Sequence, residues 1–93
     1  MTDYVVLRQV GLEPLRHRPT GATKHYHGAV ELPPPSKLAI VRYPDDPAFY
    51  LVYLDEEGNE LTDTYHDSQA QAMAQARWEF RLDENEWEVI EDG

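Results

Sequence analysis

Residues 68–82 read Ser-Gln-Ala-Gln-Ala-Met-Ala-Gln-Ala-Arg-Trp-Glu-Phe-Arg-Leu, and this stretch decides the predicted fold. It contains neither Pro nor Gly, and its many Ala and Gln residues favour a helix. Ser68 and Gln71 have the spacing of a capping box, in which each side chain bonds a backbone amide of the other residue. At about 100° per residue, one face of this helix collects Ala72, Met73, Ala76 and Phe80. We predict that the helix, about residues 68–82, packs that face on a sheet.

A β-hairpin is predicted immediately before the helix. Residues 49–55 read Phe-Tyr-Leu-Val-Tyr-Leu-Asp, are apolar on both faces, and are expected to form the central strand. Residues 56–59 form the turn, where Gly58 can adopt a positive φ. The returning strand covers residues 60–65. Its alternation predicts two inward residues, Leu61 and Tyr65, and two solvent-facing residues, Thr62 and Thr64.

The other strands are less regular. β-Branched residues and alternation predict strands at 3–10, 24–32 and 37–43. Residues 86–90 form either a last short strand, with Trp87 and Val89 inward, or a packed tail. Residues 12–23, which contain two Pro and one Gly, are expected to be an irregular loop.

These elements predict an α+β fold. We expect a single domain, residues 1–93, with an antiparallel sheet of about five strands and one main helix (about 68–82) packed on one face. Short connections favour a meander through the strands at 37–43, 49–55 and 60–65.

The composition excludes several classes of protein. The chain has 93 residues, enough for one domain, and its 11% of aromatic residues is typical of a folded core. It has no Cys, which excludes disulfides, thiolate metal sites and a Cys nucleophile. The start lacks the features of a signal peptide, and the apolar runs fall far short of the roughly 20 residues of a membrane span. We therefore expect a cytoplasmic protein.

The charge is distributed unevenly along the chain. The formal net charge is −10; residues 1–43 hold 6 of the 8 basic and 3 of the 18 acidic residues, so residues 44–93 carry an excess of 13 acidic residues. Such a field repels phosphate backbones and membrane surfaces and attracts basic partners. The basic residues near Tyr26 could suit single-stranded nucleic acid, but the net charge argues against it. We expect an acidic protein-binding domain, an adaptor, inhibitor or immunity-type factor, unless the acidity serves solubility alone.

Trp78 is the unusual residue of the predicted helix. It lies about 180° from the apolar face, in a ridge with Ala74 and Leu82, and Arg77 and Arg81 flank it. One interpretation is that the N-terminal loop or the C-terminal tail covers Trp78. The other is that Trp78, Arg77 and Arg81 contact a partner or a second copy, because Trp and Arg are favoured at interface centres.

His25, His27 and Glu31 are the candidate metal ligands. On one continuous strand they share a face, where two imidazoles and a carboxylate can hold a divalent transition metal. The spacing resembles the first motif of the cupins, His-x-His-x-x-x-Glu, over residues 25–31 alone. The expected flanking glycines and the second cupin motif have no counterpart. The resemblance implies metal binding by these three residues; the alternative is a polar strand face without cofactor.

The sequence gives little reason to expect an enzyme. Asp63, His66, Asp67 and Ser68 lie together at the junction between strand and helix. Neighbours in sequence rarely converge as a catalytic triad, and Ser68 and Asp67 have a capping role to fill. We predict no catalytic residue.

Residues 49–87 resemble a group of small, uncharacterised bacterial proteins. The resembling residues are 50–55, 58–68, Ala76, Glu79, Phe80 and Trp87, and together they form a strand–hairpin–helix unit. The resemblance implies no known activity and no functional residues, and residues 1–43 lie outside it.

Overall fold

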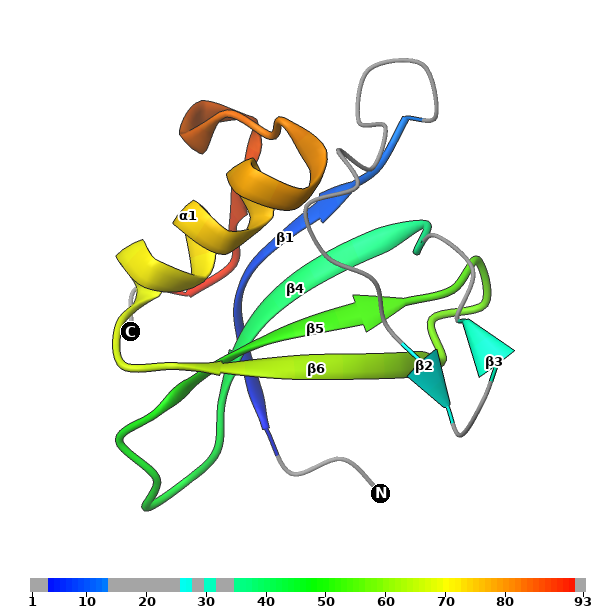
Figure 1. The fold of residues 1–93 in the computed structure, drawn as a ribbon. Helices are drawn as coiled ribbons and strands as arrows, with labels where there is room; N and C mark the ends of the chain where they lie inside the picture. Colours follow the sequence, from blue (N-terminus) through cyan, green and yellow to red (C-terminus); the bar gives the residue numbers. More distant parts are fainter. Residues whose placement is uncertain (1–3, 14–25, 28–29, 32–34, 92–93) are drawn as a thin grey trace.

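The computed structural model describes residues 4–13, 26–27, 30–31 and 35–91, and for 26–27 and 30–31 it describes the backbone alone. The elements are shown in Figure 1. Along the chain they are β1 (Val5–Gly11), β2 (Tyr26–His27), β3 (Val30–Glu31), β4 (Lys37–Arg42), β5 (Phe49–Leu54), β6 (Glu60–His66), α1 (Gln69–Phe80), a short 3-10 helix (Glu84–Glu86) and β7 (Glu88–Val89).

Five strands form one antiparallel sheet in the order β6-β5-β4-β1-β7, and α1 lies on one of its faces (Figure 1). The predicted α+β fold and the meander β4-β5-β6 are confirmed. The predicted position of residues 49–55 is wrong, because β4 occupies the centre of the sheet. β1 pairs with β4 on the side opposite β5, and β7 pairs with β1. β5 is therefore the second strand from the β6 edge.

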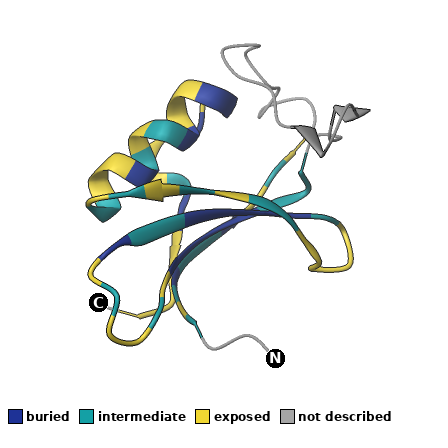
Figure 2. Ribbon diagram, turned by 60° about the horizontal axis from the view of Figure 1, so that its bottom comes forward, coloured by how far each residue is buried: buried dark blue, intermediate teal, exposed yellow. Residues whose placement is uncertain are grey.

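The sheet has an apolar core on each face. On the face toward α1, which we call the helix side, β4 and β5 supply Leu38, Ile40, Leu51 and Tyr53. On the opposite face, which we call the far side, the same strands supply Ala39, Val41, Val52 and Leu54. All eight are buried, and Figure 2 shows this burial along the middle strands. Two-sided burial explains why both strands are almost continuously apolar.

The helix begins and ends through identifiable backbone interactions. Ser68 Oγ accepts a hydrogen bond from the Gln71 amide at 3.1 Å, as predicted, whereas the Gln71 side chain accepts from the amide of Asp67 at 2.9 Å. Arg81 adopts the left-handed conformation (φ 58°), so the helix ends at Phe80 rather than Leu82. The predicted helix face is confirmed, since Ala72, Ala76 and Phe80 are buried and Met73 packs beside them.

The predicted hairpin is present, and Leu61 packs against the core on the helix side as predicted, but the predicted facing of Thr62, Thr64 and Tyr65 is wrong. Gly58 has a φ of 83°, as the turn requires. An extra residue follows, because Glu60 pairs with Leu54 and Thr62 pairs with Tyr53, so Leu61 forms a bulge. The bulge reverses the alternation. Thr62 and Thr64 consequently lie on the helix side, whereas Tyr65 lies on the far side and is 62% exposed.

Two other predicted segments differ from the structure. The stretch 24–32 is not one continuous strand, because β2 and β3 pair with each other antiparallel as a separate two-stranded sheet. The predicted last strand exists as β7, which pairs with β1, and Trp87 before it is buried. Val89, however, is 51% exposed at the outer edge. The predicted loop at 12–23 lies outside the described residues from residue 14 onward.

Among the residues that the structure describes, no helix is long and apolar enough to cross a membrane.

Candidate functional site

The helix surface around Trp78 is half-exposed. Trp78 itself is 53% exposed, and Arg77 and Arg81 are both exposed. The predicted ridge is wrong at Leu82, because the left-handed conformation of Arg81 turns Leu82 into the core, where it is 1% exposed. A shallow hollow lies beside the helix. It is lined by Ala70, Met73, Ala74, Arg77, Leu82 and Glu84.

The predicted metal site lies largely outside the described residues. His25 is not among them, and the side chains of His27 and Glu31 are not described. In the backbone register Glu31 pairs with Tyr26 and His27 pairs with Val30, so the two residues belong to different strands. Within residues 4–13 and 35–91, no group of three or more His, Asp or Glu side chains is placed to hold a metal.

The polar residues between β6 and α1 do not converge on a common point. His66 Nε2 is hydrogen-bonded to Thr64 Oγ1 at 2.8 Å, and Asp67 accepts from the Tyr65 hydroxyl at 3.0 Å. Ser68 caps the helix. Each side chain therefore has a local partner, and the geometry of a catalytic triad is absent from these residues.

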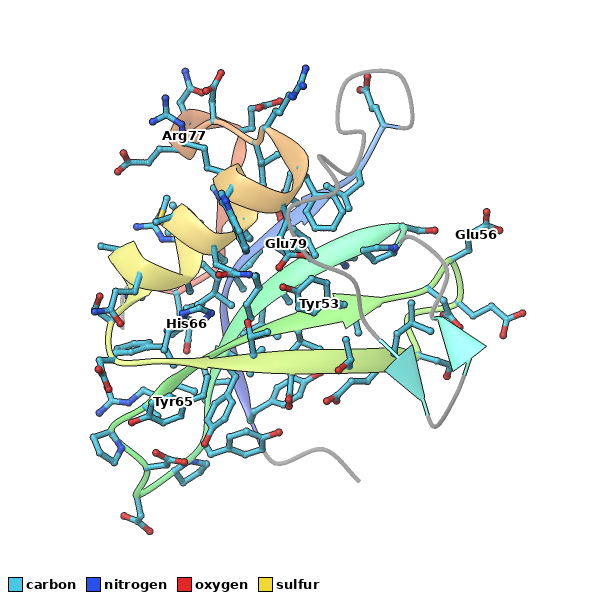
Figure 3. The ribbon with its side chains drawn as sticks, viewed as in Figure 1. Tyr53, Glu56, Tyr65, His66, Arg77 and Glu79 are labelled. Atoms are coloured by element: carbon cyan, nitrogen blue, oxygen red, sulfur yellow. The ribbon has the colours of Figure 1, made fainter. Side chains whose placement is uncertain are left out.

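A buried polar cluster joins α1 to the sheet. Glu79 is 4% exposed although it carries a carboxylate, and the hydroxyl of Tyr53, which is 1% exposed, donates a hydrogen bond to it. The side-chain amide of Gln75 donates to the same carboxylate oxygen at 2.6 Å. Figure 3 shows Tyr53 and Glu79 between the sheet and the helix.

The electrostatics of this cluster follow from its burial. Burial, followed by the hydrogen bond to Glu79, raises the pKa of the Tyr53 hydroxyl well above its usual value. Burial lowers the pKa of nearby His66, while the charges of Glu79 and Asp67 act in the opposite direction. Because both Tyr53 and Glu79 are closed to solvent, the cluster suits a structural role better than catalysis. The sequence contained the signal, since Glu79 lies seven residues after Ala72 on the buried face.

Four tyrosine rings form a continuous row on the far side of the sheet. We call Tyr4, Tyr43, Tyr50 and Tyr65 the tyrosine row. Successive ring centroids are 5.6, 5.3 and 5.8 Å apart, and each pair meets edge to face. The rings come from four different segments: the residue before β1, the residue after β4, β5 and β6. Tyr65, at the edge of the sheet, is the most exposed of the four.

Carboxylates border the tyrosine row. The hydroxyl of Tyr50 donates to Asp46 Oδ2 at 3.0 Å, and this bond is the main cause of the raised pKa of Tyr50. The hydrogen bond to Asp67 similarly raises the pKa of Tyr65. Burial, and after it the charges of Glu60 and Asp63, raise the pKa of Tyr43. The row therefore lies in a negative potential.

The tyrosine row has the chemistry of a site for organic cations. Aromatic faces attract Arg and Lys side chains through their quadrupole, and bordering carboxylates add charge attraction. Sequence reasoning missed the row because its members are spread over four segments and meet only through the register of the sheet. The pairing of Tyr50 with Tyr65 was within reach of the hairpin prediction, but the bulge at Leu61 hid it.

No protein-family model, curated protein or solved structure matches the chain. The resemblance of residues 49–87 to a group of small bacterial proteins therefore stays a prediction.

Proposed function

We propose that this chain is a protein-binding domain that docks a basic segment of another protein. The observation that carries the proposal is the tyrosine row with its bordering carboxylates: Asp46 and Asp67 accept hydrogen bonds from its hydroxyls, and the charge of Asp63 acts on Tyr43 and Tyr50. The net charge of −10 supports it, because an acidic protein attracts a basic partner over a distance of about 10 Å at 0.1 M salt.

The alternative surface at Trp78 suits such a partner less well. Trp78 has the aromatic area of an interface residue, but Arg77 and Arg81 lie beside it and repel a basic segment. The tyrosine row, in contrast, is bordered by carboxylates, which attract a basic segment. For a basic partner we therefore assign the docking surface to the row, and the surface of Trp78, Arg77 and Arg81 remains available to an acidic partner or a second copy.

The energies involved fit a reversible interaction. A cation over an exposed ring contributes about 0.5–1 kcal/mol, and an exposed ion pair adds about 0.2–1 kcal/mol. Several such contacts, made by one segment with the tyrosine row and the carboxylates that border it, are needed for useful affinity. The proposal consequently requires a partner segment with more than one basic side chain.

Binding of a synthetic octapeptide of alternating Thr and Arg tests the proposal, with the matched Thr-Glu peptide as the negative probe. We expect amide NMR shifts around the tyrosine row with the first peptide alone, and an affinity that falls as salt is raised. Tyr65→Ala should weaken binding about 2- to 5-fold, because it removes one exposed ring. Trp78→Ala is the matched aromatic control and should leave binding unchanged.

Three outcomes contradict the proposed function. The first is the absence of binding by the Arg peptide at low salt. The second is equal binding of the Thr-Glu peptide. The third is a set of shifts centred on Trp78 rather than on the row.

A further inference from the structure

One edge of the sheet is a full-length strand. β6 spans seven residues and is the last strand of the five-stranded sheet, so it pairs with β5 on one side only. β2 and β3 pair with each other and not with β6. Among the described strands, none other than β5 pairs with β6, so its outer edge forms no ladder with them. Such an edge presents unpaired backbone N–H and C=O groups to any extended chain that fits.

The edge has only part of the usual protection against pairing, namely the bulge at Leu61 and two acidic residues. β6 reads Glu-Leu-Thr-Asp-Thr-Tyr-His, without Pro or Lys. Its charged residues are Glu60 and Asp63, and both are exposed. Antiparallel pairing of two copies about their midpoint would set Asp63 against Asp63, and like charges directly opposite each other are destabilising. The edge therefore disfavours a second copy and favours a basic strand.

We propose that the partner segment adds to the outer edge of β6 as a sixth strand. This inference rests on the proposed function and specifies its geometry. The occupant is an extended segment of another protein with a basic residue at every second position.

The spacing of Asp63 and Tyr65 sets that pattern. The two residues are two positions apart on β6 and are exposed, and Tyr65 is the end of the tyrosine row at this edge (Figure 3). On an added strand, the side chains opposite them are also two apart, with Cβ atoms about 4.5–5.5 Å from their partners. A basic side chain opposite Asp63 forms an ion pair. The guanidinium of an Arg opposite Tyr65 stacks on the Tyr65 ring at the end of the tyrosine row.

The intervening positions face the helix side. There the added strand lies beside Thr62, Thr64 and His66, of which Thr62 and Thr64 are short and polar. A β-branched polar residue such as Thr pairs well across strands. The alternating Thr-Arg octapeptide therefore matches both faces, and main-chain hydrogen bonds add affinity that side chains alone do not supply.

The first experiment separates strand addition from side-chain docking. Two forms of the Thr-Arg octapeptide are N-methylated, one at the odd and one at the even positions, so that each loses a different row of backbone donors. Strand addition predicts that one form loses binding by about tenfold or more, since it loses ladder hydrogen bonds, while the other keeps most of it. It also predicts slower amide exchange in β6 on binding of the unmodified peptide.

A charge exchange at the edge provides the second experiment. Asp63→Lys should reduce the affinity for the Thr-Arg peptide about tenfold and create affinity for the Thr-Glu peptide. Glu84→Lys is the matched control, because it makes the same change of charge on the exposed 3-10 helix, outside β6. Glu84→Lys should change the affinity for both peptides only slightly, through the net charge of the protein.

The results distinguish the two proposals. Equal binding of both methylated forms and of the unmodified peptide, with shifts still at the tyrosine row, overturns strand addition and leaves the proposed function standing. Equal effects of Asp63→Lys and Glu84→Lys also overturn it. Failure of every basic peptide to bind overturns both.

Discussion

The hydroxyl of Tyr53 on β5 donates a hydrogen bond to the carboxylate of Glu79 on α1, and both residues are buried. This bond links the only long helix among the described residues to the interior of the sheet. A carboxylate is costly to bury unless it has hydrogen-bond partners, and Tyr53 and Gln75 supply them. The position of α1 on the sheet is thus fixed by a polar contact as well as by its alanines.

Removing either side of this bond should destabilise the domain. Tyr53→Phe and Glu79→Ala should each lower the free energy of unfolding by about 1–3 kcal/mol, because each deprives a buried polar group of a partner. The double variant should lose less than the sum, with a coupling of about 1–2 kcal/mol. Urea unfolding measures all three. Arg77→Ala, on the exposed side of α1, is the control and should change stability by less than about 0.5 kcal/mol. Additive losses in the double variant would contradict the link.

The stability of the domain should depend on pH through His66. Burial lowers the pKa of His66 in the folded state. As the pH falls through 6.5, the value for the unfolded chain, the unfolded chain therefore binds a proton before the folded protein does. The contribution of neutral His66 is present above pH 6.5 and is lost as the pH falls toward the lower folded pKa. The free energy of unfolding should therefore decrease between pH 7.5 and 5.5.

The comparison with His66→Gln isolates this effect from that of the carboxylates. The wild-type protein should lose more stability than the variant over the same interval, and NMR titration of the His66 ring should give a pKa below 6.5. A ring that titrates above 6.5, or two parallel stability curves, would contradict the prediction.

The parts of the fold that depend on local sequence were predictable. The helix from Ser68 and the turn at Gly58 follow from capping and backbone preference within a few residues. The faces of β6 were not predictable, because the extra residue at the bulge, Leu61, places the following side chains on the opposite face of the sheet. The burial of Glu79 was missed for another reason. Its position on the helix indicates the core, whereas its charge indicates exposure to solvent. The Tyr53 hydroxyl, which provides the hydrogen bond that allows burial, lies 26 residues away in the sequence.

The candidate site was harder to predict than the fold. The tyrosine row joins residues as far apart in sequence as Tyr4 and Tyr65, so its existence depends on the order of the strands. Composition gave only the acidic charge and the expectation of a basic partner. Trp78 was the more visible candidate because a single helix is enough to show that it lies away from the core.

The hydrogen bond between Tyr50 and Asp46 should control the ionisation of the tyrosine row. The Asp46 carboxylate accepts from the Tyr50 hydroxyl and stabilises the neutral phenol, so the pKa of Tyr50 should lie above 10. Asp46→Asn removes the charge and should lower that pKa toward 10. Its side-chain oxygen can still accept from the Ala48 amide, which keeps the loop in place. Titration of the tyrosine ring carbons by NMR measures the change.

Tyr4 provides the internal control in that titration. Burial and the charge of Glu60 raise the pKa of Tyr4, and Asp46 takes no part in it. Asp46→Asn should leave the Tyr4 signal where it is. An equal shift of both tyrosines would mean that the substitution acts through the fold and not through the hydrogen bond.

The end of α1 offers a test of backbone strain. Arg81 adopts a φ of 58° and its amide donates to the carbonyl of Arg77 at 2.9 Å, a geometry that glycine adopts without cost. Arg81→Gly should raise the free energy of unfolding by about 0.5–1 kcal/mol, because relief of the left-handed strain exceeds the added freedom of the unfolded chain. Arg77→Gly, inside the last turn of the same helix, should lower it by about 1 kcal/mol. Urea unfolding of the two variants compares glycine in the left-handed conformation at position 81 with glycine in the helical conformation at position 77. Equal destabilisation by both substitutions would show that the side chain of Arg81, rather than its backbone, matters for stability.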